Sequence, residues 1–92
     1  MTAYITVGFT PLNKELIQAY SAKAASTIAK FEGEFLAKAP VQSLSGSRLY
    51  EYQAIIAFPT KIQAESWYNS AEYQELINLR DRGMNSSFQL IG

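Results

Sequence analysis

The chain has 92 residues, and its eight basic and eight acidic residues leave a formal net charge of zero. The length predicts one domain spanning residues 1–92. The balanced charge argues against a nucleic-acid partner, because phosphate binding needs an excess of Lys and Arg. The chain has no Cys and no His, which excludes disulfides, thiolate or imidazole metal sites and catalysis by either side chain. We therefore expect no metal and no cofactor.

Hydrophobic residues make up 48% of the chain, which is typical of a globular protein and excludes a disordered one. No apolar run approaches the roughly 18 residues of a membrane span, and the first residues do not form a signal peptide. The sequence therefore predicts a cytoplasmic protein with no membrane partner.

The first predicted element is a strand over Ala3–Phe9, because its odd-numbered residues are apolar. A helix should follow, because apolar residues recur at intervals of three or four between Leu12 and Phe31. Either Thr10 or Asn13 has the side-chain oxygen needed to cap the start of that helix. We expect Gly33 to end it in the left-handed conformation that costs glycine little.

A second strand is predicted over Glu34–Lys38. Pro40 should interrupt it, and Val41–Leu44 should continue it beyond a bulge or bend. The small residues Ser45–Ser47 predict a turn. A third strand is expected over Arg48–Phe58, and its apolar end is typical of a central strand that is covered on both faces.

The second half of the chain predicts two helical segments and a last strand. Thr60 and Gln63 form a capping box, which indicates a helix start. The polar pair Asn69–Ser70 should break this helix, and a second segment should run on to Gly83. Alternation over Ser87–Ile91 predicts the final strand.

The element order is therefore β-α-β-β-α-β with a split second helix. This order predicts an α+β protein of ferredoxin-like topology, with one antiparallel sheet and its helices on one face.

The predicted third strand has large apolar groups on both faces. Tyr50, Tyr52, Ile56 and Phe58 should share one face, and Leu49, Ile55 and Ala57 the other. Helices can cover only one face, and an exposed apolar patch usually marks an interaction surface. We therefore expect a homodimer built through the open face of the sheet. The alternative is a soluble surface that is merely rich in tyrosine.

A pattern of residues resembles the family called domain of unknown function thirteen-thirty. It comprises Phe58–Pro59–Thr60, Ala64, Trp67–Tyr68, Ser70, Glu72–Tyr73, Leu76 and Leu79–Arg80, with Gly33–Glu34–Phe35–Leu36 and Tyr20 earlier in the chain. The resemblance implies a dimeric α+β barrel and little about function. Members often carry an Arg followed by two glycines where this chain has Lys38–Ala39–Pro40. A site that needs a bidentate Arg there would be weakened.

The best candidate ligand site combines Trp67, Tyr68, Ser70, Tyr73 and Arg80. If this helix face lines a gap above the sheet, Arg80 could hold a carboxylate or enolate while the aromatic rings stack on a ring of the ligand. The alternative is that the rings are core residues, that Ser70 is a helix cap, and that Arg80 complements a helix dipole.

A second candidate combines Arg48, Tyr50 and Tyr52 on one side of the third strand, with Tyr4 nearby. These residues would present a cation and hydroxyl groups to a ligand inside the barrel. The alternative is cross-strand packing in a dimer interface.

Three functions follow from these features. The first is a homodimeric binding or accessory module for a small acidic or aromatic metabolite. The second is a cofactor-independent enzyme of the monooxygenase or isomerase type, which similar folds host and in which Asn69 or Asn85 would stabilise an oxyanion. The third is a purely structural interaction protein. The sequence leaves open whether the chain is an enzyme, which ligand it takes, and in which process it acts.

Overall fold

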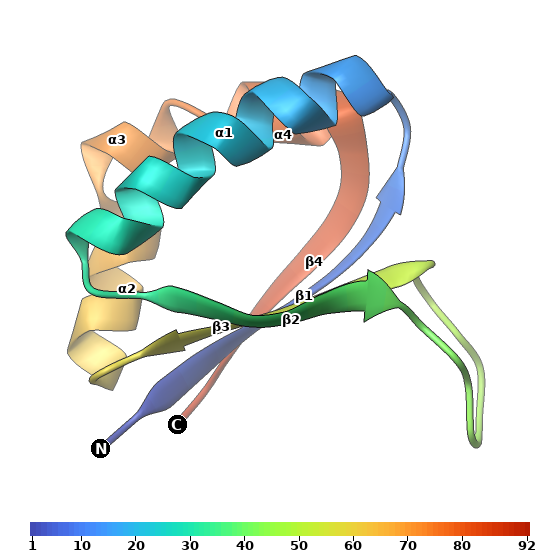
Figure 1. Cartoon of the computed structure of the whole chain (residues 1–92), viewed down its shortest axis with the longest axis horizontal. Coiled ribbons are helices and arrows are strands. Elements are labelled where there is room, and N and C mark those ends of the chain that lie inside the picture. The colour runs from blue at the N-terminus through green and yellow to red at the C-terminus, as the bar shows by residue number, and fades with distance from the viewer.

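The computed structural model describes all 92 residues. Its elements are β1 (Ala3–Pro11), α1 (Lys14–Lys30), β2 (Glu34–Pro40), β3 (Tyr52–Phe58), α2 (Lys61–Asn69), α3 (Ala71–Gln74), α4 (Ile77–Gly83) and β4 (Met84–Ile91). The strands form one antiparallel sheet in the order β2-β3-β1-β4, and the helices cover one face of it (Figure 1). The predicted ferredoxin-like α+β fold is confirmed. The second helical region, however, has three segments where the sequence predicts two.

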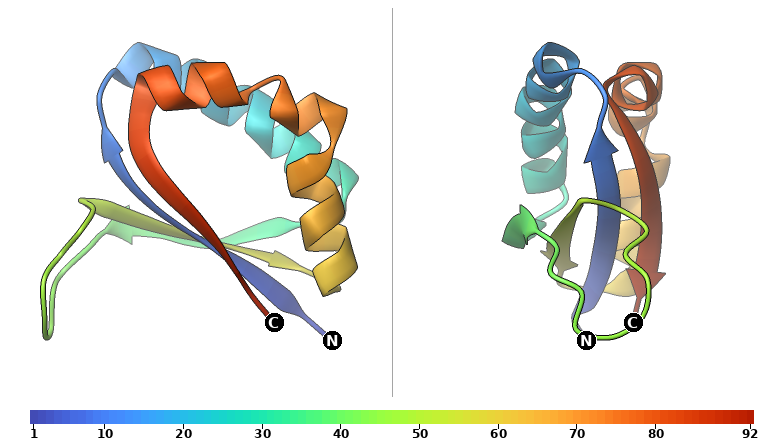
Figure 2. Two further views of the ribbon diagram at one scale, coloured as in Figure 1. Left: turned by 180° about the vertical axis from the view of Figure 1, so that it is seen from behind. Right: turned by 90° about the vertical axis from the view of Figure 1, so that its right-hand side faces the viewer.

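The connection between β2 and β3 differs from the prediction. β3 begins at Tyr52 and not at Arg48, and Val41–Leu44 forms no strand. Residues 41–51 instead form an arm that projects from the sheet on the side away from the helices (Figure 2). The pairing of β3 with β1 ends at the Phe9–Tyr52 pair. Beyond that point the arm has no third strand beside it, and a two-stranded ribbon alone is only marginally stable.

The last strand begins at Met84, three residues before the predicted start at Ser87. Its pairing with β1 runs to the Pro11–Met84 pair. The carbonyl of Gly83 also accepts hydrogen bonds from the N–H groups of Leu12 and Asn13, at 2.8 and 3.0 Å. The chain therefore passes from α4 into β4 without a loop, because β1 extends far enough to pair with it.

The structure identifies the residue that caps the start of α1 and corrects the prediction for its end. The Asn13 side chain accepts a hydrogen bond from the Leu16 N–H at 3.1 Å, so Asn13 is the cap and Thr10 is not. The left-handed residue after the helix is Glu32, with φ 65°, and not the predicted Gly33. Gly33 is needed for space, because a Cβ there would lie 2.6 Å from the ring of Phe58.

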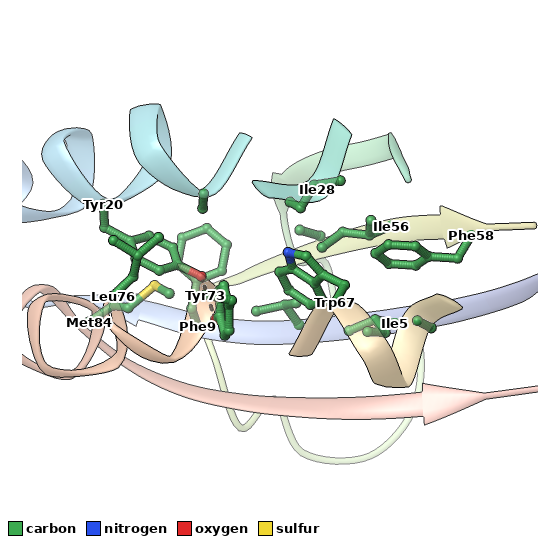
Figure 3. Packing of buried hydrophobic residues seen from close by; sticks show 14 of the residues in the cluster. Ile5, Phe9, Tyr20, Ile28, Ile56, Phe58, Trp67, Tyr73, Leu76 and Met84 are labelled. Atoms are coloured by element: carbon green, nitrogen blue, oxygen red, sulfur yellow. Dashed lines mark hydrogen bonds between the residues drawn. The ribbon is translucent and has the colours of Figure 1, made fainter. Parts of the chain in front are cut away.

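The core lies between the sheet and the helical layer (Figure 3). It is a cluster of buried hydrophobic residues from β1, α1, β3, α2, α3 and β4. Its largest fully buried side chains are Trp67, Tyr73 and Phe58. The rings of Trp67 and Tyr73 lie 4.3 Å apart between centroids, and Phe58 lies 5.5 Å from Trp67. Aromatic packing therefore joins the helical layer to the central strand β3.

The open face of the sheet is less apolar than the sequence predicts. The strand register places Tyr4 beside Ala57 and Thr6 beside Ile55 on this face. Tyr4 is 37% exposed and Ile55 is half-buried, while Gln53 is polar and exposed. Leu49, which is expected on the same face as Ile55 and Ala57, lies outside β3 in the arm.

Replacing Trp67 with Ala should destabilise the fold by about 3–5 kcal/mol, because the ring is fully buried and its loss leaves a cavity. Denaturant unfolding measures this change in the free energy of unfolding. Ile62→Ala is the matched control on the same helix, because Ile62 is 74% exposed. A loss below about 1 kcal/mol for Trp67→Ala would contradict the core position.

Candidate functional site

Four of the predicted site residues come together above the sheet. Trp67 and Tyr68 lie on α2, Tyr73 on α3 and Arg80 on α4. The Arg80 side chain is only 11% exposed, and its Nη1 donates hydrogen bonds to the hydroxyls of Tyr68 and Tyr73, each at 3.1 Å. The three short helices are therefore joined through one guanidinium group.

Arg80 has further partners. Its Nε donates to the carboxylate of Asp81 at 3.0 Å, and its guanidinium carbon lies 4.7 Å from the ring centre of Phe88 on β4. Burial disfavours the charge, but the hydrogen bonds to Tyr68 and Tyr73 outweigh it and raise the pKa of Arg80 above its usual value. The site therefore holds a permanent positive charge that its own neighbours largely satisfy.

The chain of hydroxyls continues to α1. The Tyr73 hydroxyl lies 2.7 Å from that of Tyr20, within the core. Burial raises the pKa of Tyr20, and the neighbouring Tyr73 raises it further. Burial also raises the pKa of Tyr73, although its bonds from Tyr20 and Arg80 oppose this. Both phenols are therefore neutral at physiological pH, and neither is a general base there.

Trp67 and Ser70 hold the helices in place around this cluster. The indole N–H of Trp67 donates to the Thr27 hydroxyl at 2.9 Å, and Trp67 has no exposed surface. Ser70 donates to the Trp67 carbonyl at 2.7 Å and accepts from the Tyr73 N–H at 3.2 Å, so it caps α3. No cavity in the structure is lined by Trp67, Tyr73 or Arg80.

The second predicted cluster is divided between two faces of the sheet. Tyr52 stacks on Phe9 on the side of the helices, at 5.3 Å between ring centres. Tyr50 lies on the open face, where a Cβ on Gly8 would meet its ring at 2.6 Å. The prediction that Arg48, Tyr50 and Tyr52 share one side is therefore wrong, because residues 48–51 leave the strand and the alternation of a strand no longer applies to them.

Arg48 and Tyr50 line a groove of about 260 Å³ between the arm and the open face, together with Thr6, Gln53 and Gln89. A second groove of about 260 Å³ lies between α2 and β4 and includes Tyr68. Both grooves are open to solvent, and a partner on the open face of the sheet would cover the first.

An apolar pocket lies between α1 and the sheet. Of its thirteen lining residues eleven are hydrophobic, among them Phe9, Tyr20, Ala24, Ile56 and Phe88. Its volume is about 40 Å³, which is room for water and not for a metabolite. Tyr20 forms part of its wall, and the hydroxyl of Tyr20 is hydrogen-bonded to that of Tyr73, which lines no cavity.

Phe35 and Lys38 on β2 also line the pocket. The strand pairing shifts at Leu36, so that Phe35 pairs with Ile56 and Lys38 with Ala54. Both partners face the core, and the bulge therefore directs both Phe35 and Lys38 towards the helices.

Sequence reasoning missed Tyr20 and Lys38 as site residues. A hydroxyl on the apolar stripe of the first helix was the available signal for Tyr20, because a buried phenol needs a partner. Nothing in the residue pattern indicates a bulge at Leu36, so Lys38 could not be assigned to the side of the helices.

No group of three or more acidic side chains converges to hold a metal ion. No helix is long and apolar enough to cross a bilayer.

A family model described as Domain of unknown function (DUF1330) matches residues 2–92. The chain belongs to this family. The resemblance predicted from the Trp67–Tyr68 and Leu79–Arg80 pattern is confirmed. No curated protein matches the sequence.

Solved structures share the fold of this DUF1330 chain. A protein of unknown function from Rhodopseudomonas palustris is similar with a TM-score of 0.81 and 12% identity, over 98% of this chain and 80% of that one. A dimeric ferredoxin-like protein of unknown function from a Jannaschia species has a TM-score of 0.68 and 16% identity, over 97% and 98%. The cofactor-independent oxygenase SnoaB from Streptomyces nogalater has a TM-score of 0.68 and 12% identity, over 99% and 90%. At these identities the similarity shows the fold alone.

The two buried phenols should resist ionisation in alkali. The unfolded chain loses their protons near the ordinary pKa of 10.0, while the folded chain keeps them. Their contribution to stability is therefore fully present below about pH 10 and is lost as the pH rises above it. Phenolate absorbance should show Tyr20 and Tyr73 ionising only when the chain unfolds.

Tyr20→Phe should make the alkaline loss of stability shallower, because it removes one of the two buried phenols. Ionisation of all six tyrosines in a chain that stays folded would contradict this prediction.

Proposed function

We propose that this protein is a homodimeric binding protein for a small aromatic metabolite, which lies in the apolar pocket between α1 and the sheet. The observation that carries the proposal is the wall of this pocket. Phe9, Phe35, Phe88 and Tyr20 contribute aromatic rings from four different elements. A set of rings around an otherwise aliphatic space favours a flat ring as the ligand.

The pocket must widen to admit such a ligand, and β2 is the side on which it can do so. β2 is an edge strand, and all its residues are exposed. Phe35 is 48% exposed although it lines the pocket. Its outward rotation sacrifices little buried surface, whereas movement of α1 or β3 would disturb the core.

The chemistry of the site supports binding over proton transfer. The groups behind the pocket are two neutral phenols and a guanidinium that stays charged. None of these groups can accept a proton from a ligand at neutral pH.

The dimer in this proposal forms through the open face of the sheet. Tyr4 and Ile91 are exposed there at 37% and 56%, and Leu44 and Leu49 on the arm at 92% and 85%. The ferredoxin-like protein from Jannaschia is described as dimeric. A second copy of the chain would cover these side chains, because a two-fold interface uses the same surface of both subunits. A cytoplasmic location remains a prediction.

A cofactor-independent oxygenase is the second candidate. SnoaB has this activity on the same fold, and in this chain the Tyr20 ring at the pocket wall is connected through the Tyr73 hydroxyl to the cation of Arg80. Incubation with a hydroquinone and O₂ tests it. Absence of turnover by the wild type would remove this candidate. Turnover that Arg80→Ala leaves unchanged would remove the role of Arg80 in it.

Binding in the pocket can be tested with naphthalene-2-methanol, a neutral flat probe. We expect it to shift the NMR signals of the Ile28 and Ile56 methyl groups, which line the pocket. Ala24→Leu and Ser21→Leu, at a buried and a half-buried wall position, should each weaken binding about tenfold or more by filling the space.

Ala25→Leu is the matched control, because Ala25 is exposed on the same helix. If the folded wild-type chain shows no shifts, or if both filling variants bind like the control, the pocket is not a binding site. The purely structural function would then remain.

The dimer predicts a sedimentation result. The wild type should sediment as two subunits at micromolar concentration. Ile55→Glu should yield a folded monomer. The new charge would be buried in the dimer interface, which disfavours association. In the single subunit Ile55 is only half-buried, so the charge can reach water and the subunit can still fold. Gln18→Glu, with the same change of charge on the exposed side of α1, should remain dimeric. A wild type that is a stable single subunit would refute the dimer.

A further inference from the structure

Lys38 is directed at the pocket by the irregular pairing of β2. In a regular strand, residues three apart point to opposite faces. Here the pairing shifts between Phe35 and Ala37, so that Phe35 pairs with Ile56 and Lys38 pairs with Ala54. Phe35 and Lys38 therefore lie on the same face of the sheet. Bulges commonly re-aim a side chain near a functional site. The side chain of Lys38 therefore lies at the pocket as a consequence of the bulge.

Lys38 is the only charged residue among those that line the pocket. Its ammonium group lies 5.7 Å from the centre of the Phe9 ring, which forms the wall beside it. The two ion pairs of the protein join Lys30 to Glu72 and Arg80 to Asp81, so Lys38 has no carboxylate partner. The pocket thus combines an apolar interior with one uncompensated positive charge on its exposed side.

We propose that Lys38 binds an anionic group of the ligand, and that the ligand is an aromatic acid with a single negative charge. This inference rests on the proposed function and adds the chemical class of the ligand. Once Phe35 has turned outward, the ring would enter the widened pocket beside Ala24 and Ile56, and the carboxylate would reach the ammonium group at the edge of β2. A charge-assisted hydrogen bond there is stronger than one to a neutral hydroxyl.

Two probes of the same shape test the proposal. The probe 2-naphthoate carries the charge, and naphthalene-2-methanol replaces it with a neutral hydroxyl. We expect the wild type to bind the naphthoate about tenfold more tightly, as measured by calorimetry at low salt. Lys38→Met should abolish this preference by lowering the affinity for the naphthoate, and Lys38→Arg should preserve it.

Lys23→Met is the control, because Lys23 is an exposed cation on α1 that does not line the pocket. Equal affinity of the wild type for both probes, or equal loss of the preference in Lys23→Met and Lys38→Met, would overturn the role of Lys38. The proposed function would stand in that case, provided that Ser21→Leu still weakens both probes. If neither probe binds, both the inference and the proposed function fail.

Discussion

The arrangement of the helical layer depends on the burial of Tyr73. This side chain has no exposed surface, yet its hydroxyl needs partners, because an unpaired polar group in a core is costly. Arg80 and Tyr20 supply them, from α4 and α1. One phenol thus fixes three helices relative to one another, and the adjoining Trp67 ring ties them to the sheet through Phe58.

The same requirement explains why the strongest cluster in the sequence is not itself a cavity. Arg80 donates hydrogen bonds to Tyr68, Tyr73 and Asp81, and it lines no cavity of the structure. The open space lies one side chain away, beyond Tyr20. The network therefore supports the wall of the pocket, while the charge available to a ligand lies on β2.

Residue patterns predicted the parts of the fold that regular periodicity determines. The alternation in Ala3–Phe9 and the capping box at Thr60 correspond to β1 and to the start of α2. The predictions failed where pairing partners decide the outcome. Arg48 lies in an arm because β1 ends its pairing with β3 at Phe9, and β4 starts early because β1 extends to Pro11. For the candidate site, helical spacing brought Trp67 together with Arg80 but could not reveal the bulge that turns Lys38.

The two halves of the proposed function meet in the central strands. In β1, Val7 lines the pocket while Thr6 faces the other side, and in β3, Ile56 lines the pocket while Ile55 faces away from it. Successive residues of one strand would thus contact the ligand and the second subunit. β1 and β3 lie in the middle of the sheet and are paired on both sides, so they cannot move aside for a ligand, whereas β2 is an edge strand. A ligand is therefore expected to enter by moving Phe35 and Lys38, and the dimer to hold the opposite wall rigid.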